Sequence, residues 1–147
     1  MSENRSGIGY DAHRLVPERK LTLGGVHIPH KYGLKGHSDG DVLIHAVIDS
    51  LLGAASLGDI GTHFSSTDPE LRDVSSISLL RQTKDLVRSV GWDVVFVDAT
   101  ILAEKPRLSP YLIGMKSSIS KVLDLGCSNI NVKSTTTDGL GFIGEQE

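Results

Sequence analysis

Three stretches of the chain repeat apolar residues at the spacing of an amphipathic helix. The first runs from about residue 40 to 55, and the second runs from 75 to 90. The third begins at Ser109, has Pro110 in its first turn and is followed by Gly126. Serine before a helix, proline at its start and glycine after its end are common boundary residues. The pattern therefore predicts three helices.

Residues 7–14 and 20–28 are predicted as short strands on either side of a turn. Residues 92–103, which are rich in β-branched side chains, and residues 130–136 predict two further strands. With the helices, the element order becomes ββααβαβ, and no linker or repeat divides it. We therefore expect a single domain, residues 1–147, of the α/β (α+β) class. It should contain a roughly four-stranded sheet with helices on one face. The bare face of such a sheet needs a partner, which indicates an oligomer packed through its sheets.

The composition narrows the possible classes of protein. Of 147 residues, 39% are hydrophobic and 22% are charged, as in globular domains. A net charge of -3 argues against a nucleic-acid partner. The longest apolar stretch, residues 42–57, is too short and too polar to span a membrane. With one cysteine and no apolar leader, the expected location is the cytoplasm, or a plastid stroma if a transit peptide has been removed.

Asp11 and His13 are two residues apart in one of the predicted strands. Alternate residues of a strand point to the same side, so this carboxylate and this imidazole would converge on one point. Such a pair could bind a metal ion. Taken alone, the pair is more often a hydrogen-bonded pair at the surface, since short motifs often occur by chance.

His45 lies inside the first predicted helix, four residues from both Asp41 and Asp49. A lone histidine there could be a satisfied core residue. However, the segment 36–41 also places one imidazole, one hydroxyl and two carboxylates just before the helix, more than capping requires. Two histidines and one carboxylate form a familiar catalytic zinc set, which Asp11, His13 and His45 would complete. Asp41 could be a helix cap or an outer group of that site.

Three further polar segments each allow two interpretations. Gly58-Asp59-Ile60-Gly61 is either a turn or a site for substrate hydroxyls. The hydroxyl-rich run 134–139 suits a strand end, or phosphate oxygens and a hard cation such as magnesium. Residues 104–107 follow a strand, where ligands often bind in α/β folds, but a solvated loop is also possible.

Together, these segments resemble the cyclodiphosphate synthase family of the non-mevalonate isoprenoid pathway. The blocks His37-Ser38-Asp39-Gly40-Asp41 and Lys133-Ser134-Thr135-Thr136-Thr137 are highly specific in combination. The remaining matching segments occur in family order and cover nearly the whole chain: Gly9-Tyr10-Asp11-Ala12-His13, Leu23-Gly24-Gly25-Val26, Leu51-Leu52-Gly53-Ala54-Ala55 and Gly58-Asp59-Ile60-Gly61.

The resemblance implies a metal-dependent phosphorus–oxygen lyase. Its substrate would be 4-diphosphocytidyl-2-C-methyl-D-erythritol 2-phosphate. The 2-phosphate attacks the β-phosphorus, CMP leaves, and 2-C-methyl-D-erythritol 2,4-cyclodiphosphate forms. Two alternatives remain: a zinc-dependent phosphodiesterase, which would place water in line, and a nucleotide-binding relative without turnover.

The resemblance also implies roles for particular residues. Zinc would be held by Asp11, His13 and His45, and a second divalent ion, magnesium or manganese, by Asp138. Transition-state stabilisation would fall to His37 and Thr136. Substrate contacts would come from the metal ligands Asp11 and His13 and from Ser38, Asp59, Ile60, Gly61, Phe64, Asp68 and Phe142. The cytidine pocket would comprise Ala103, Lys105, Pro106, Arg107, Leu108, Ser109, Thr135, Thr136, Thr137 and Asp138. The family forms homotrimers whose sites are shared between neighbours.

Four features depart from the family pattern. The family usually has Glu at the position of Asp138 and a Pro-Asp pair at Ser65-Ser66. Glu145 stands where a phosphate-binding Arg is frequent. The family continues with a short apolar tail beyond Glu147, so we expect the sequence to lack that tail.

Overall fold

A computed structural model describes residues 3–147 of the chain. Its elements are, in order, β1 (Leu15–Pro17), β2 (Leu21–Leu23), β3 (Val26–Ile28), β4 (Tyr32–Leu34), α1 (Val42–Ala54), α2 (Ile60–His63), η1 (Pro69–Leu71), α3 (Ser76–Ser89), β5 (Val97–Leu102), η2 (Ser109–Tyr111), α4 (Leu112–Leu123), η3 (Cys127–Asn129), β6 (Ile130–Thr135) and α5 (Gly141–Gly144). The three long helices and the strands β5 and β6 lie inside the predicted ranges, so these predictions are confirmed. The mixed content confirms an α+β domain.

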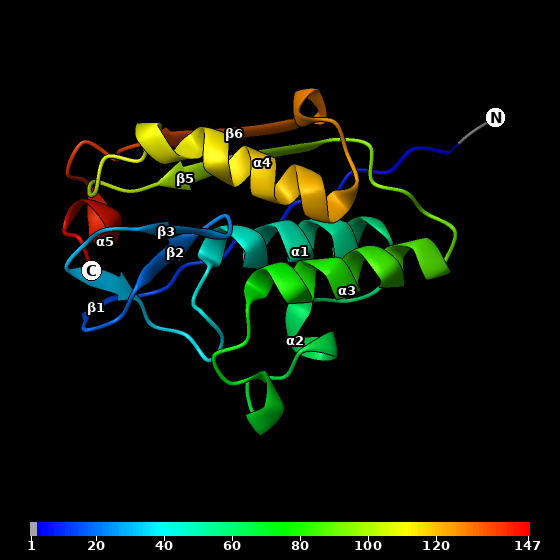
Figure 1. The fold of residues 1–147 in the computed structure, drawn as a ribbon, viewed down its shortest axis with the longest axis horizontal. Coiled ribbons are helices and arrows are strands. Elements are labelled where there is room, and N and C mark those ends of the chain that lie inside the picture. The colour runs from blue at the N-terminus through cyan, green and yellow to red at the C-terminus, as the bar shows by residue number, and fades with distance from the viewer. Residues whose placement is uncertain (1–2) are drawn as a thin grey trace.

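The predicted single sheet is wrong for the described residues, whose strands form three two-stranded sheets. In two of these sheets, β1 pairs with β4 and β2 pairs with β3, both antiparallel. In the third, β5 and β6 are parallel and joined through α4, which lies across this pair (Figure 1). Helices α1 and α3 pack side by side in the next layer (Figure 1). The core lies between these layers.

The predicted strand 20–28 is in fact the β2–β3 hairpin. Gly24 and Gly25 form its two-residue turn with φ angles of 59° and 74°. Both angles are in the left-handed region that glycine adopts at little cost, which favours a tight hairpin turn. The sequence pattern reads as one strand because apolar residues continue on both sides of the turn.

The predicted strand 7–14 forms no ladder with any described strand. Instead, the segment runs against α1. A Cβ atom on Gly9 would lie 1.8 Å from the carbonyl oxygen of Ala46, and one on Gly7 would lie 2.0 Å from that of Ser50. Only glycine permits this approach, which brings the chain close to the first turns of α1 just before Asp11.

Asp41 caps α1 and also holds the β2–β3 turn. Its carboxylate accepts hydrogen bonds from the backbone N–H groups of Ile44 at 3.1 Å, Gly24 at 2.9 Å and Gly25 at 2.7 Å. Complete burial raises the pKa of Asp41 to about 6, although these three donors act in the opposite direction. The sequence left open whether Asp41 caps the helix or belongs to the outer part of the metal site, and these contacts are those of a helix cap.

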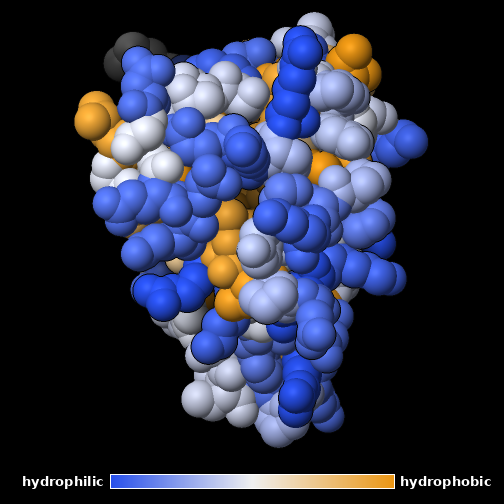
Figure 2. All heavy atoms as spheres, turned by 90° about the vertical axis from the view of Figure 1, so that its left-hand side faces the viewer, coloured by the Kyte–Doolittle hydropathy of each residue, from blue (hydrophilic) through white to orange (hydrophobic). Residues whose placement is uncertain are grey.

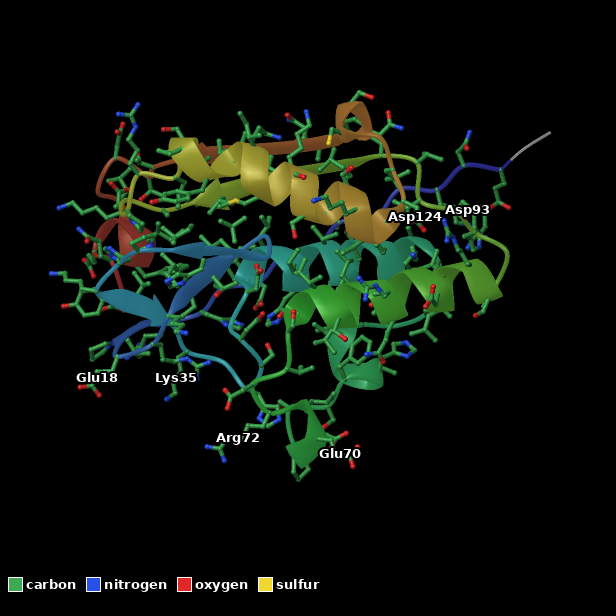
Figure 3. All side chains as sticks on the ribbon, in the orientation of Figure 1. Glu18, Lys35, Glu70, Arg72, Asp93 and Asp124 are labelled. Carbon is green, nitrogen blue, oxygen red and sulfur yellow. The ribbon has the colours of Figure 1, made fainter. Side chains whose placement is uncertain are left out.

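Charged side chains such as Glu18, Glu70 and Arg72 point away from the core (Figure 3). Asp124, which ends α4, accepts a hydrogen bond from Lys84 of α3 at 2.9 Å and so ties the two helices together. No helix within residues 3–147 combines the length and apolar character needed to cross a bilayer.

Candidate active site

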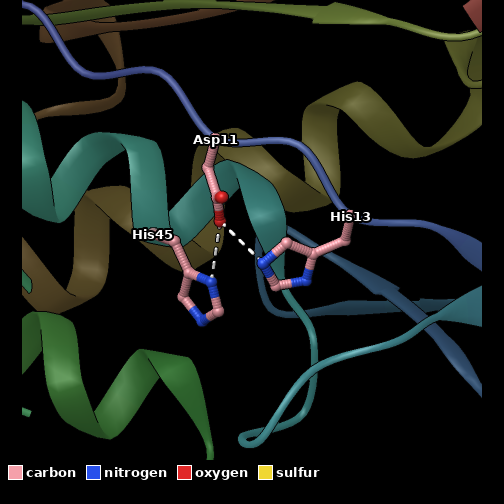
Figure 4. A group of neighbouring side chains, drawn as sticks. All are labelled: Asp11, His13 and His45. Atoms are coloured by element: carbon pink, nitrogen blue, oxygen red, sulfur yellow. Dashed lines mark hydrogen bonds and ion pairs between the residues drawn. The ribbon is translucent and has the colours of Figure 1, made fainter. Parts of the chain in front are cut away.

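Asp11, His13 and His45 meet at one point, although α1 supplies only His45. Oδ2 of Asp11 lies 2.9 Å from Nε2 of His13 and 3.0 Å from Nδ1 of His45 (Figure 4). The candidate ligand atoms of the three residues all lie within 4.8 Å of one another. The glycine-rich segment before Asp11 makes this possible because it lies directly on α1.

The electrostatics of this triad suit a cation. Burial would raise the pKa of Asp11, but its hydrogen bonds with His13 and His45 outweigh that effect and hold the pKa well below its usual range. The carboxylate is therefore ionised over the whole physiological pH range. One carboxylate oxygen and two imidazole nitrogens, with room for a further ligand, match a catalytic zinc site in donor type and number.

The far side of the His45 ring contacts two buried hydroxyls. Nε2 lies 2.9 Å from Oγ of Ser76 and 3.0 Å from Oγ of Ser38. Ser76 in turn donates its hydroxyl proton to Asp39. Ser38 was expected to contact substrate, but in this structure its hydroxyl lies within hydrogen-bonding distance of His45. Sequence reasoning missed Ser76, whose only signal was its place at the start of the second predicted helix.

A cavity of about 350 Å³ opens beside the triad. The predicted substrate residues Ile60, Gly61 and Phe64 line it, together with His37. Asp59 and Asp68 instead cap α2 and η1, respectively, and neither lines the cavity. Hydrogen bonds from the side chain and backbone of Thr62 lower the pKa of Asp59. Nε2 of His37 donates to the carbonyl oxygen of Asp68 at 2.7 Å, which fixes the imidazole at the edge of the η1 turn.

The second predicted group assembles where β5 and β6 end. The register pairs Leu102 with Thr135, so the segments 103–109 and 135–138 leave the same end of the sheet. Ala103 donates its N–H to the carbonyl oxygen of Thr135 at 3.0 Å. In α/β sheets, ligands commonly bind beyond this end of parallel strands.

Glu104 fastens these two segments together. Its Oε1 accepts hydrogen bonds from the backbone N–H of Thr137 at 2.7 Å, from the hydroxyl of Thr137 at 3.0 Å and from the N–H of Gly139 at 3.4 Å. These bonds, above all the one from the Thr137 backbone, lower the pKa of Glu104. The turn holds Asp138 in the left-handed conformation, with φ of 54°.

The remaining predicted cytidine residues differ in exposure. Lys105, Arg107, Ser109, Thr135, Thr136 and Asp138 are exposed, whereas Ala103, Pro106 and Thr137 are half-buried. The side chain of Leu108 is 4% exposed and belongs to the core. Its side chain therefore packs inside the domain, where it also lines an apolar cavity.

Within residues 3–147 of one chain, the cavity beside the triad is lined by no residue of the segments 103–109 and 135–138. Neither Thr136 nor Asp138 lines the cavity beside the triad. A second, apolar cavity of about 200 Å³ extends between the two groups. It is lined by Asp11 and His13 of the triad, by Ala103, Lys105, Pro106 and Leu108 of the segment 103–109, and by Phe142. Apolar side chains are visible in a hollow on this end of the molecule (Figure 2).

The model of the YgbB family matches residues 4–147, almost the whole chain. The chain belongs to this family. The 2-C-methyl-D-erythritol 2,4-cyclodiphosphate synthase of Syntrophobacter fumaroxidans (strain DSM 10017 / MPOB) is 53% identical over 143 residues, which are 97% of this chain and 90% of that protein. The predicted family is thereby confirmed, and the predicted cyclodiphosphate synthase function is supported over its two alternatives.

Solved structures of the family share the fold. A 2-C-methyl-D-erythritol 2,4-cyclodiphosphate synthase in a CDP-bound form has a TM-score of 0.87 and 38% identity, covering 92% of this chain and 91% of that one. The bifunctional IspDF from Campylobacter jejuni has a TM-score of 0.93 and 45% identity over 97% of this chain. This chain spans only 39% of that longer protein.

Proposed function

We propose that the chain acts as a phosphorus–oxygen lyase of the non-mevalonate isoprenoid pathway. It converts 4-diphosphocytidyl-2-C-methyl-D-erythritol 2-phosphate to 2-C-methyl-D-erythritol 2,4-cyclodiphosphate and releases CMP. The observation that carries this proposal is the convergence of Asp11, His13 and His45 beside a 350 Å³ cavity in a member of this family.

The reaction needs positioning more than covalent chemistry by the protein. An oxygen of the 2-phosphate forms a bond to the β-phosphorus, and the bond from that phosphorus to the CMP oxygen breaks. Holding the two phosphates in the reactive geometry can contribute about 7–11 kcal/mol in favourable cases. The cavity walls at Ile60, Gly61 and Phe64 would confine the methylerythritol part.

Asp11, His13 and His45 would hold zinc, and Asp138 would hold a magnesium or manganese ion that accompanies the substrate. Such ions supply Lewis-acid stabilisation of negative charge on phosphate oxygens. His37 lines the same cavity and would stabilise charge that develops on the reacting phosphates. Thr136 would do so from the other group, and Ser38 and Asp59 would bind at the methylerythritol end.

We propose that the segments 103–109 and 135–138 bind the cytidine diphosphate. The support is their shared position beyond the ends of β5 and β6, together with the existence of a solved relative in a CDP-bound form. Backbone groups here can read the base, while Lys105 and Arg107 neutralise phosphate charge. A cytoplasmic location stays a prediction.

A homotrimer would join the two groups across a subunit boundary. Two observations support this arrangement. One chain keeps Thr136 and Asp138 apart from the triad cavity. Large apolar side chains are also exposed on the segment before Asp11, with Ile8 at 92% and Tyr10 at 73%, and Phe96 beside β5 is 55% exposed. Such exposure indicates a surface that another chain covers.

Incubating the full chain with the cytidine-linked 2-phosphate, zinc and magnesium tests the proposal. CMP should appear in step with substrate loss, as measured by chromatography, and His45→Ala should release none. Unchanged substrate with the metal-loaded protein would contradict the proposed function.

A further inference from the structure

Beyond the three candidate ligands lies a buried chain of hydrogen bonds that ends on His45. Asp39 precedes α1, Ser76 is the first residue of α3, and His45 lies in α1. Ser76 has no exposed surface, and His45 is 8% exposed. The packing of α1 against α3 therefore places the Ser76 hydroxyl against the imidazole and excludes water from that contact.

The direction of each hydrogen bond in this chain is fixed by chemistry. A carboxylate can only accept, so the single hydroxyl proton of Ser76 goes to Oδ1 of Asp39. The Ser76 oxygen must then accept from the imidazole, and Nε2 of His45, 2.9 Å away, is the donor. With its proton on Nε2, a neutral His45 presents an unshared electron pair at Nδ1.

That electron pair points to the triad centre, where Nδ1 is 3.0 Å from Oδ2 of Asp11. Two electron-rich atoms at this separation repel each other unless a cation lies between or beside them. The opposite tautomer would place a proton on Nδ1, where it would bind Asp11 and block the metal. The tautomer of His45 thus decides whether Nδ1 donates a hydrogen bond to Asp11 or is free to bind a metal ion.

The geometry assigns Ser76 and Asp39 as positioning residues that hold His45 in its Nε2–H tautomer, with Nδ1 free to ligate a metal ion. This inference rests on the metal site of the proposed function. Partners of the non-ligating nitrogen of a metal-bound histidine typically contribute about 10–100-fold to metal affinity.

If Ser76 and Asp39 served only to hold the start of α3, removing the Ser76 hydroxyl would leave the metal affinity unchanged. The backbone N–H of Ser76 also donates to Oδ2 of Asp39, at 3.0 Å, and this bond alone suffices to fix the start of α3. Ser76→Ala keeps that bond and removes only the hydroxyl. A loss of metal affinity in this variant would therefore come from the lost hydrogen bond to His45 and not from a change at the start of α3.

The test measures zinc affinity of the full-length chain by competition with a chromophoric chelator. We expect Ser76→Ala to bind zinc about 10–100-fold more weakly than the unchanged chain. Asp39→Ala removes a carboxylate that is hydrogen-bonded to Ser76 rather than to His45, and it should weaken binding in the same direction because it frees the Ser76 proton to donate to Nε2. If the two residues act as a unit, the double variant should be no weaker than Ser76→Ala.

Two variants serve as controls. Thr83→Val removes another fully buried hydroxyl of α3, which donates to the Leu79 carbonyl oxygen, and should leave zinc affinity unchanged. Ser38→Ala removes the second hydroxyl at 3.0 Å from Nε2 but leaves the Ser76–Asp39 bond, so its effect should be less than that of Ser76→Ala. Thermal denaturation of the metal-free variants provides a second readout. A positioning role predicts a loss of zinc affinity in Ser76→Ala that any loss of thermal stability does not account for.

The outcomes separate this inference from the proposed function. If the unchanged chain does not bind zinc, the proposed metal site itself is wrong. If it binds zinc and Ser76→Ala binds zinc equally well, only the positioning role is overturned. Loss of thermal stability in Ser76→Ala with unchanged zinc affinity would also overturn it.

Discussion

Glu104 and Thr137, 33 residues apart in sequence, are joined by two hydrogen bonds at the ends of the parallel strands β5 and β6. The carboxylate of Glu104 accepts both the N–H and the hydroxyl of Thr137. Because Asp138 follows directly, the same contact orients the residue proposed to hold the second divalent ion.

Replacing Glu104 with Ala should weaken binding of CDP roughly tenfold, since a charge-assisted anchor of the nucleotide segment is lost. Calorimetric titration with CDP and magnesium measures this effect. Glu70→Ala, which removes an exposed carboxylate pointing away from the core (Figure 3), should bind CDP normally. Equal CDP affinity in Glu104→Ala and the unchanged chain would refute the anchoring role.

The buried cap Asp41 should make stability depend on pH. Its pKa rises from 3.8 to about 6 on folding, so the folded chain holds the proton more tightly than the unfolded chain. Its contribution to the free energy of unfolding is then fully present below about pH 4 and falls by roughly 3 kcal/mol as the pH rises through 6. Asp41→Asn lacks this titration. Chemical denaturation from pH 4 to 7 should show the stability difference between the two proteins changing over that window, and a constant difference would contradict the prediction.

The purified chain should carry about one zinc ion per chain, because two imidazoles and a carboxylate retain this ion. Elemental analysis should find the ion lost in His45→Ala. His27→Ala, which removes an exposed histidine of the β2–β3 hairpin, should keep it. Full zinc content in His45→Ala would show that the ligand assignment is wrong.

If each site is shared between chains of a trimer, two inactive variants should complement each other. Mixing unfolded His45→Ala with unfolded Thr136→Ala and refolding them together should restore part of the activity, since some sites would receive one intact group from each chain. Light scattering should show a trimer. An active monomer, or mixtures without activity, would contradict the shared site.

Most of the elements followed from local patterns, and their failures have physical causes. The apolar residues at helical spacing in α1 and the β-branched residues in β5 predict these two elements without knowledge of their neighbours. The strand predicted over residues 7–14 depended on a pairing partner, which no local pattern reveals. The small strands β1 and β4 have three residues each, too few for a repeating pattern.

The candidate site was predictable where residue chemistry is distinctive. Asp11, His13 and His45 form an unusual set, and the structure brings them together. Ser76 and Glu104 could not be assigned in the same way, because serine and glutamate occur at many positions without special roles. Their contacts depend on the packing of α1 against α3 and on the register of β5 with β6.

Phosphorus NMR of the reaction products tests the proposed cyclisation most directly. The full-length chain, loaded with zinc and magnesium, is incubated with 4-diphosphocytidyl-2-C-methyl-D-erythritol 2-phosphate. We expect the resonances of CMP and of a cyclic diphosphate, in equal amounts and without a free 2-phosphate. CMP together with methylerythritol carrying separate 2- and 4-phosphates would mean that water attacks instead, as in a phosphodiesterase, and would contradict the proposed function.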